Sequence, residues 1–493
     1  MSINVKTLSL TVLLVGALLP LAFAPFGYYL LAELALMVLL YAISTAAAGR
    51  AFWYGWLFGV GFFAFGIYWL YISIHHFGNA PVILALAILG VLIAFLALYP
   101  ALQSYLLQWL YPQNNWQKLL IAFPALWVIA EWIRGWFLSG FPWLFLGYGH
   151  VASALRGWAT IFGVYGVSFV IAQTAGAIVC CFYYRNKIKV VAILVLYIVV
   201  LWVSGTILAR INWNKPIGEP IQVSLIQGNV ALQQKWDEKE LLPILHSYAD
   251  LTKQNLASKI IVWPEAAIPI YPENVQLYLQ VLSNIAQKHN TTILSGIPFY
   301  DRASGKYYNG ILAFGKYSGR YYKRYLVPFG EYLPLSFMLG WMHNYLTIPM
   351  AEFSRGGKKQ PELLVDKTPL APFICYEIAY ANLVLEYIPQ AGLLVTVCDD
   401  SWFGASIAAA QHLEIARMRS LEVSRYQLLC TNTGITAIIA ADGKIIAQAP
   451  ILNQAVLNGQ VQFLSGRTPW CSFGHYILLP LMVLLLWLAR AKK

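Results

Sequence analysis

Charged residues are scarce in this chain of 493 residues, of which only 11% are Asp, Glu, Lys or Arg. Soluble domains carry about 25% charged residues. Hydrophobic residues make up 59% of the chain. This composition excludes a wholly soluble globular protein, because the chain cannot cover its surface with charge. Most of it is expected to lie in lipid.

Cysteine is also rare. Six cysteines are too few for a disulfide scaffold in a chain of this length. Cys180 and Cys181 fall inside an apolar run, where we expect them to fill space on the lipid side of a span. The other four belong to a more polar part of the chain, where an oxidising compartment could pair some of them: Cys375, Cys398, Cys430 and Cys471.

Motifs for bound cofactors are missing, and no cofactor is expected. The chain has no C-x-x-C or histidine-rich spacing, so no metal site is predicted. It has no G-x-x-x-x-G-K-[ST] loop for nucleotide phosphates. The net charge of +12 is scattered along the chain rather than gathered on one face. That distribution argues against a nucleic-acid partner and is compatible with attraction to anionic lipid.

Long apolar runs are what the sequence does have. About 20 apolar residues are needed to cross a bilayer as a helix. Runs of roughly this length predict eight spans, near residues 7–25, 29–48, 53–73, 82–110, 117–137, 158–183, 188–208 and 472–490.

Basic residues predict the orientation of these spans. Those in short connections would fall on one side of an eight-span path, which the positive-inside rule makes cytoplasmic: Lys6, Arg50, Lys118, Arg185, Lys187, Lys189, Arg490, Lys492 and Lys493. Arg134 is the main exception. We therefore expect a bundle of seven transmembrane helices over 1–210, an external domain over 211–471 and a last transmembrane helix over 472–493.

The external segment alternates strand-like apolar runs with amphipathic helical stretches, which is typical of a layered α/β domain. Functional groups of such domains gather where strands end. Glu265 ends "KIIVWPE", Cys375 ends "APFIC", and Asp399 and Asp400 follow "LLVTVC". Lys323 lies between them in the chain, in "YYKRYLVPFGE". We expect several of these polar groups to meet at one edge.

Cys375 has three interpretations: an inert core thiol, half of a disulfide, or a nucleophile. Taken alone, the residue favours a buried inert thiol, because free cysteine is among the most buried residue types. Taken alone in the same way, Glu265 is expected to be a solvated loop carboxylate and Lys323 a surface lysine.

A set of motifs in a fixed order changes this balance. They run from "LAFAPFG" (21–27) and "EWIRGWFLSGFPW" (131–143) to a second series that covers the external domain: "WPEAAIP", "LVPFGEYLP", "FSRGG", "ICYE", "DDSWFG", "QHLEIARMRSLEVSR" and "TNTGITAII". Over nearly its whole length the chain resembles apolipoprotein N-acyltransferase, a bacterial inner-membrane enzyme built on a nitrilase-like domain. It departs from that pattern at Asp399, where the family usually has Asn.

The resemblance implies a nitrilase-like αββα sandwich on the periplasmic side of the bacterial inner membrane. It implies a catalytic triad of Glu265, Lys323 and Cys375, supported by Glu331, Tyr376 and Glu377. It also implies substrate-region roles, which we assign to Trp236, Arg134 and Trp143. Packing is the competing interpretation for Tyr376 and Trp236, and Arg134 could instead form a structural pair with Glu131. His412 is expected on a helix face, packed or solvated.

The chemistry of these residue types agrees with the implied triad. A cysteine attacks as thiolate and has a pKa near 8.5, so it needs a proton acceptor or a cationic neighbour. Glu265 would be the acceptor. Lys323 would favour the thiolate and then stabilise the tetrahedral oxyanion, and Glu331 would hold the lysine in place.

The implied activity is acyl transfer in two halves. Cys375 would attack an ester of a membrane phospholipid, leaving a thioester on the enzyme. The α-amine of the diacylglyceryl-modified N-terminal cysteine of an apolipoprotein would then take the acyl chain as an amide. The enzyme is expected to be a monomer. The rival interpretations are a membrane-tethered amidase, which could use the same triad, and a transporter or scaffold with an inactive external domain.

Overall fold

The computed structural model describes residues 4–332, 353–388 and 390–490. The chain divides into two compact units. The helical unit comprises Met1–Tyr71, Pro81–Asn212 and Thr468–Lys493, and the sheet unit comprises Ile72–Ala80 and Trp213–Arg467. Each unit is described separately below.

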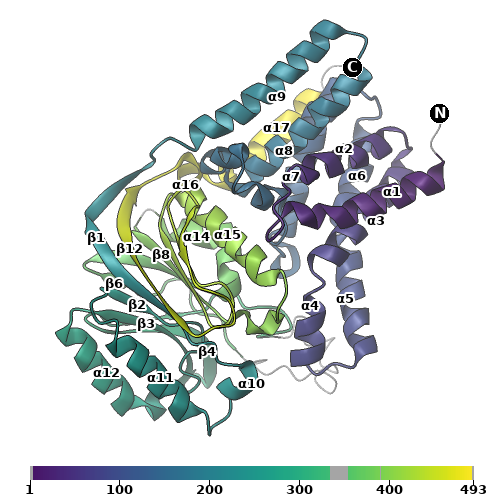
Figure 1. Ribbon diagram of the computed structural model, residues 1–493. Helices are drawn as coiled ribbons and strands as arrows, with labels where there is room; N and C mark the ends of the chain where they lie inside the picture. Colours follow the sequence, from purple (N-terminus) through teal and green to yellow (C-terminus); the bar gives the residue numbers. More distant parts are fainter. Residues whose placement is uncertain (1–3, 333–352, 389, 491–493) are drawn as a thin grey trace. The chain divides into compact units, whose positions relative to one another are not determined.

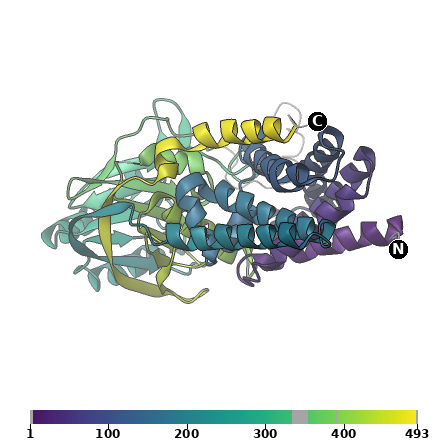
Figure 2. The ribbon, with the colours of Figure 1, turned by 90° about the horizontal axis from the view of Figure 1, so that it is seen from above.

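The helical unit is built from apolar helices (Figure 1). α8 and α9 lie side by side in both views of the ribbon (Figures 1 and 2). The principal helices are α1 (Val5–Leu18), α2 (Leu31–Ser44), α3 (Ala48–Gly66), α5 (Val82–Leu96), α6 (Leu98–Leu110), α7 (Phe123–Arg134), α8 (Ala159–Tyr183), α9 (Ile188–Leu208) and α17 (His475–Arg490).

Glycines on α3 let its neighbours approach closely. A Cβ on Gly55 would lie 2.3 Å from the carbonyl oxygen of Pro100 in α6, and one on Gly61 would lie 2.3 Å from that of Leu13 in α1. Small residues serve this purpose where helices pack in lipid, because helix association there depends on close van der Waals contact. In contrast α9 exposes large apolar side chains such as Ile188 and Ile193, as a lipid-facing helix does.

The predicted number of eight spans is not confirmed. Within the described residues, four helical stretches are long and apolar enough to cross a membrane, or five if the bent pair Ala48–Gly66 and Leu70–Phe77 is one span. Helices are present at the other predicted positions but are shorter. α2 has 14 residues and α17 has 16, so α2 is about 21 Å long against a hydrocarbon core of about 30 Å.

The sheet unit contains two six-stranded sheets. The first has the order β12 (Ala455–Gly466), β1 (Asn214–Gln227), β2 (Ile260–Val262), β3 (Thr292–Asp301), β4 (Lys306–Gly315), β5 (Gly319–Tyr322). The second has the order β11 (Ile445–Gln448), β10 (Ala437–Ile439), β9 (Gln427–Thr431), β8 (Leu393–Cys398), β7 (Thr368–Ile374), β6 (Leu363–Val365).

Helices cover the outer faces of both sheets, so the unit has the predicted αββα layers (Figure 1). α11 (Leu241–Lys253) and α12 (Gln276–Lys288) pack on the first sheet, and α15 (Ala408–Val423) packs on the second. Strands of the two sheets contact one another, as β1 does β9 and β4 does β7. Trp263, which is fully buried, belongs to the core between the first sheet and its helices.

Parallel strands bring the ends of distant segments together. β7 and β8 are parallel, with Ile374 opposite Val397, so Cys375 and Cys398 follow at the same level. All six residues of β8 are buried, as expected for a parallel strand covered on both faces. The polar residues that end these strands therefore meet at one edge of the sandwich.

Candidate active site

Glu265 lies just beyond β2 and is almost completely buried. Its Oε1 accepts a hydrogen bond from Asn309 Nδ2 at 2.7 Å, and its Oε2 accepts one from the backbone N–H of Asp399 at 3.0 Å. Both partners donate, so the site is built to hold Glu265 as a carboxylate. Burial nevertheless raises its pKa, and the nearby Lys323 partly offsets this increase. A carboxylate in this state is a better proton acceptor than an exposed one.

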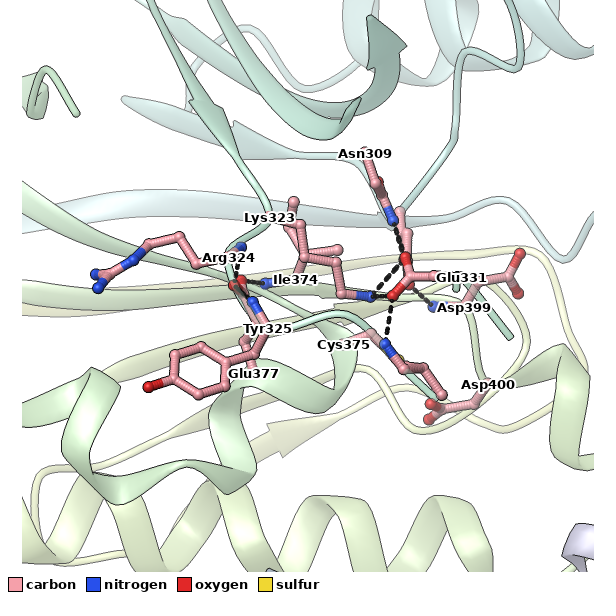
Figure 3. Close-up of polar contacts among 12 residues, drawn as sticks. Asn309, Lys323, Arg324, Tyr325, Glu331, Ile374, Cys375, Glu377, Asp399 and Asp400 are labelled. Carbon is pink, nitrogen blue, oxygen red and sulfur yellow. Dashed lines mark hydrogen bonds and ion pairs between the residues drawn. The ribbon is translucent and has the colours of Figure 1, made fainter. Parts of the chain in front are cut away.

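Lys323 follows β5 and has an exposed fraction of 1%. Figure 3 shows its side chain reaching toward Glu331, with the Nζ 2.9 Å from the Glu331 carboxylate. Glu265 Oε1 is 3.5 Å from the same nitrogen. Burial alone would lower the pKa of this lysine, but the two carboxylates outweigh burial and raise it. Lys323 is therefore a permanent cation in the site.

Glu331 completes this cluster. Its Oε1 accepts a hydrogen bond from Asn309 Nδ2 at 2.9 Å, and its Oε2 accepts one from the backbone N–H of Val327 at 2.9 Å. Asn309 thus bridges Glu265 and Glu331. The structure fixes Glu331 beside Lys323, where it can hold the ammonium in place.

Cys375 begins the 3-10 turn Cys375–Ala379 directly after β7, with a φ of 51°. A side chain in this left-handed region at a strand-to-helix turn is strained and projects its reactive atom from the sheet. The hydrogen bond from Cys398 is the largest single influence on the pKa of the Cys375 thiol, and it lowers this pKa. Burial and the negative charge of Glu265 outweigh this bond and the charge of Lys323, and the pKa is raised overall. The resting group is a thiol, so a base is required before attack.

None of the six cysteines, all of which lie within the described residues, is in a disulfide. The disulfide interpretation of Cys375 is therefore excluded here. Its sulfur, that of Cys398 and an oxygen of Asp400 lie within 4.8 Å of one another, and these atoms could hold a metal ion. Asp400 Oδ1 also lies 3.1 Å from His412 Nδ1, so the Asp400 carboxylate is already part of a hydrogen-bond network.

Glu377 is buried and joins two segments of the site. Its carboxylate accepts hydrogen bonds from the backbone N–H groups of Arg324 (2.6 Å), Tyr325 (3.1 Å) and Ile374 (2.9 Å), and from the hydroxyl of Tyr321 (3.0 Å). Figure 3 shows this carboxylate joining the segment after Lys323 to the strand before Cys375. It therefore fixes the relative positions of the lysine and the thiol.

Burial raises the pKa of Glu377 from 4.5 to about 7. Between these values the unfolded chain loses a proton that the folded protein keeps, so stability is full below about pH 4.5 and falls as the pH rises to about 7. The loss is on the order of 3 kcal/mol. We expect the difference in Tm between the wild type and Glu377→Gln to change across this window. In Glu386→Gln, which removes a partner of Arg324 that is 36% exposed, the difference in Tm from the wild type should change little over the same pH range. If the difference for Glu377→Gln were equally independent of pH, the raised pKa of Glu377 would be contradicted.

The remaining predicted residues are placed differently. Trp236 is 42% exposed, at the end of the short helix α10 (Leu232–Lys235). Tyr376 packs edge-on against Tyr380, with ring centroids 5.2 Å apart. Its place next to Cys375 is compatible with a supporting role.

Arg134 and Trp143 lie in the helical unit, where both are buried. Arg134 donates hydrogen bonds to the carbonyl oxygens of Trp143 and Leu144 and lies over the ring of Phe145. The Trp143 ring packs against Trp69, with centroids 5.5 Å apart. These contacts give both residues a structural role in holding the loop after α7, and their assignment to substrate binding remains a prediction.

Sequence reasoning missed three parts of the site: Asn309, Lys235 and the contact of His412 with Asp400. Asn309 is a buried polar residue in the middle of β4, an unusual place for Asn that is visible in "YYNGILAF". His412 was expected to pack or to be solvated on a helix face. It is buried, and its Nε2 lies 3.2 Å from the carbonyl oxygen of Cys375.

Comparison with known families first assigns a class to the sheet unit. Residues 222–467 match the model of the carbon-nitrogen hydrolase family. A solved structure, Nit3 of Saccharomyces cerevisiae from the nitrilase superfamily, is 17% identical, with a TM-score of 0.39 over 51% of this chain and 93% of that chain.

The helical unit makes the assignment more specific. Residues 15–177 match the model of the apolipoprotein N-acyltransferase N-terminal domain. The chain is 42% identical to the apolipoprotein N-acyltransferase of Coxiella burnetii over 97% of this chain and 99% of the relative. It is 40% identical to the apolipoprotein N-acyltransferase of Methylococcus capsulatus, over 94% of this chain and 91% of that relative. The chain belongs to the apolipoprotein N-acyltransferase family.

Proposed function

We propose that this protein transfers an acyl chain from a membrane phospholipid to the N-terminal α-amine of a diacylglyceryl-modified apolipoprotein. Membership of the family supports the reaction. The observation that carries the chemistry is the buried cluster of Glu265, Lys323 and Glu331, in which Lys323 pairs with both carboxylates. The charges of Glu265 and Lys323 both act on the Cys375 thiol.

In the first half-reaction Glu265 takes the thiol proton while the Cys375 sulfur attacks the ester carbonyl of the phospholipid. The ammonium of Lys323 stabilises the negative oxygen of the tetrahedral intermediate, and such a donor contributes roughly 3 kcal/mol. The intermediate expels the lysophospholipid alkoxide, which recovers the proton from Glu265. A thioester on Cys375 remains.

In the second half-reaction the α-amine of the apolipoprotein attacks the thioester. An α-amine has a pKa of about 8, so a base must take a proton as the C–N bond forms, and Glu265 serves again. The proton passes to the departing Cys375 thiolate. Replacing a thioester by an amide is downhill, so no nucleotide is required.

The localisation of the protein, its number of spans and its oligomeric state are part of the same proposal. Both substrates carry acyl chains, which leave a bilayer at a cost of about 0.8 kcal/mol per CH₂. We place the protein in the bacterial inner membrane as a monomer with eight spans and with the sheet unit on the periplasmic side. Burial of Glu265, Lys323 and Cys375 restricts water, which favours attack by the amine over hydrolysis of the thioester.

The proposal is tested by supplying the purified protein with a defined phospholipid and a peptide whose N-terminal cysteine carries diacylglycerol. Mass spectrometry should find lysophospholipid and an N-acylated peptide in equal amounts. A matched peptide with a blocked α-amine should yield no acylated product. Cleavage of C–N bonds without acyl transfer would instead support a membrane-tethered amidase and overturn the proposal.

A further inference from the structure

Lys235, at the end of α10, is a buried cation outside the predicted triad. It is 2% exposed and forms an ion pair with Asp399, whose carboxylate is 5% exposed. The same Nζ donates a hydrogen bond to the backbone carbonyl oxygen of Glu265 at 3.2 Å. Lysine is almost never buried in this way unless it is paired, and here both of its partners belong to the site.

Asp399 also contacts Glu265, through a different group. Its backbone N–H donates to Glu265 Oε2 at 3.0 Å. Lys235 and Asp399 therefore hold Glu265 at two points, the backbone carbonyl oxygen and the side-chain carboxylate. The three residues come from segments separated by 30 and 134 positions in the chain, so the ion pair joins α10, the end of β2 and the end of β8.

The carboxylate of Asp399 also accepts hydrogen bonds from donors other than Lys235. Ser401 Oγ lies 2.6 Å and Asn432 Nδ2 lies 3.2 Å from Asp399 Oδ1. Its negative charge acts on Glu265 and contributes to raising the pKa of that carboxyl. Without a compensating cation this charge would make Glu265 harder to ionise.

We propose that Lys235 is a positioning residue for the Glu265 base: it anchors the backbone of Glu265 and cancels the charge of Asp399, so that Glu265 is ionised at neutral pH. This inference rests on the proposed function, in which Glu265 takes the proton of the Cys375 thiol. Lys235 itself touches neither the sulfur nor a substrate in this account.

Other charged and titratable groups also act on Glu265, and they stay constant across the variants below. They are Lys323 after β5, Glu331 in the following loop, Cys375 after β7, Cys398 at the end of β8 and His412 on α15. A change in the ionisation of Glu265 between those variants is therefore assigned to Lys235 and Asp399.

The test is the pH dependence of acylation of Cys375 by phospholipid in mixed micelles, without an acceptor, followed by intact mass. The acid limb of the pH–rate profile is the range in which the rate falls as Glu265 becomes protonated. In Lys235→Met this limb should shift to a pH about one unit higher, so the reaction at a given pH on the limb should be about tenfold slower. Asp399→Asn should move it down. The double variant Lys235→Met/Asp399→Asn should return close to the wild-type limb, because both charges are gone. Lys239→Met, which changes an exposed lysine of the same segment, should leave the limb in place.

A purely structural role for Lys235 predicts something else. Lys235→Met and the double variant would then be slowed equally at every pH, with no shift of the limb, and this result would overturn the inference. Failure of the wild-type protein to become acylated at any pH would instead overturn the proposed function. The two failures are therefore distinguishable in one experiment.

Discussion

Replacing Cys375 with alanine is expected to abolish both acylation of the protein and transfer to the apolipoprotein peptide. The account gives the sulfur a covalent role that no neighbouring group can take over, so the rate should fall by roughly 10⁴-fold or more. Cys375→Ser should be almost as inactive, because a buried hydroxyl is a much weaker nucleophile than a thiol. Product formation is measured by mass spectrometry with phospholipid and peptide present.

Two controls separate chemistry from folding in this prediction. Cys375→Ser is nearly isosteric and should unfold within a few degrees of the wild type. Cys430→Ala removes another buried thiol of the same sheet and should retain transfer. Wild-type rates in Cys375→Ala, measured in cells or vesicles without another copy of the enzyme, would remove the nucleophile from the account.

Replacing Lys323 with methionine should lower the rate of acyl-enzyme formation by about 10²- to 10³-fold, because the oxyanion loses its cationic partner. The variant should also be less stable. Glu265 and Glu331 would face one another across a buried site without the ammonium that lies within 3.5 Å of both. Breaking a buried ion pair from one side costs about 3–5 kcal/mol. Single-turnover kinetics and Tm report the two effects separately.

Lys259→Met is the matched control for this variant. Lys259 pairs with Asp366 in the same unit, but both side chains are about one-third exposed, so its removal should cost less than about 1 kcal/mol and leave the rate unchanged. If Lys323→Met were as active and as stable as Lys259→Met, the buried cluster would have no role in the chemistry.

The arrangement of the strand ends could be predicted from the sequence because polar, chemically reactive residues stand directly after apolar, strand-like runs. Glu265, Cys375 and Asp399 each end an apolar run, and parallel strands bring such ends to the same edge. Their assignment to a triad required the family resemblance, since each residue alone has a more ordinary interpretation. The alternation of strand-like and helical segments predicted a layered α/β domain, and the αββα order of its layers was implied by the family resemblance.

Other parts of the site depend on contacts between remote segments, which no local pattern reveals. Asn309 bridges two carboxylates only because β4 pairs with β3 in one particular register. Lys235 meets Asp399 across 164 positions of the chain. In the same way apolar composition predicted where helices occur but not their lengths: α2 and α17, with 14 and 16 residues, are shorter than the apolar runs predicted there.

The aromatic residues of the sequence likewise did not show which of their side chains would be buried. In the "EWIRGWFLSGFPW" segment, substrate-region roles were assigned to Arg134 and Trp143. In the structure Trp143 is buried and Trp136 is 49% exposed, although both are Trp in the same short segment. Composition does not distinguish the two environments, because the difference arises from the packing of Arg134 against the backbone around Trp143.

The proposed function requires Cys375 to carry the acyl chain between the two substrates. The most direct measurement is peptide mapping by mass spectrometry after incubation with phospholipid alone, followed by a chase with the acceptor peptide. The account predicts one acyl group on the peptide that contains Cys375, released by neutral hydroxylamine and transferred to the acceptor in a single turnover. An unmodified Cys375 in a protein that still transfers acyl chains, or an acyl group on another residue, would contradict it.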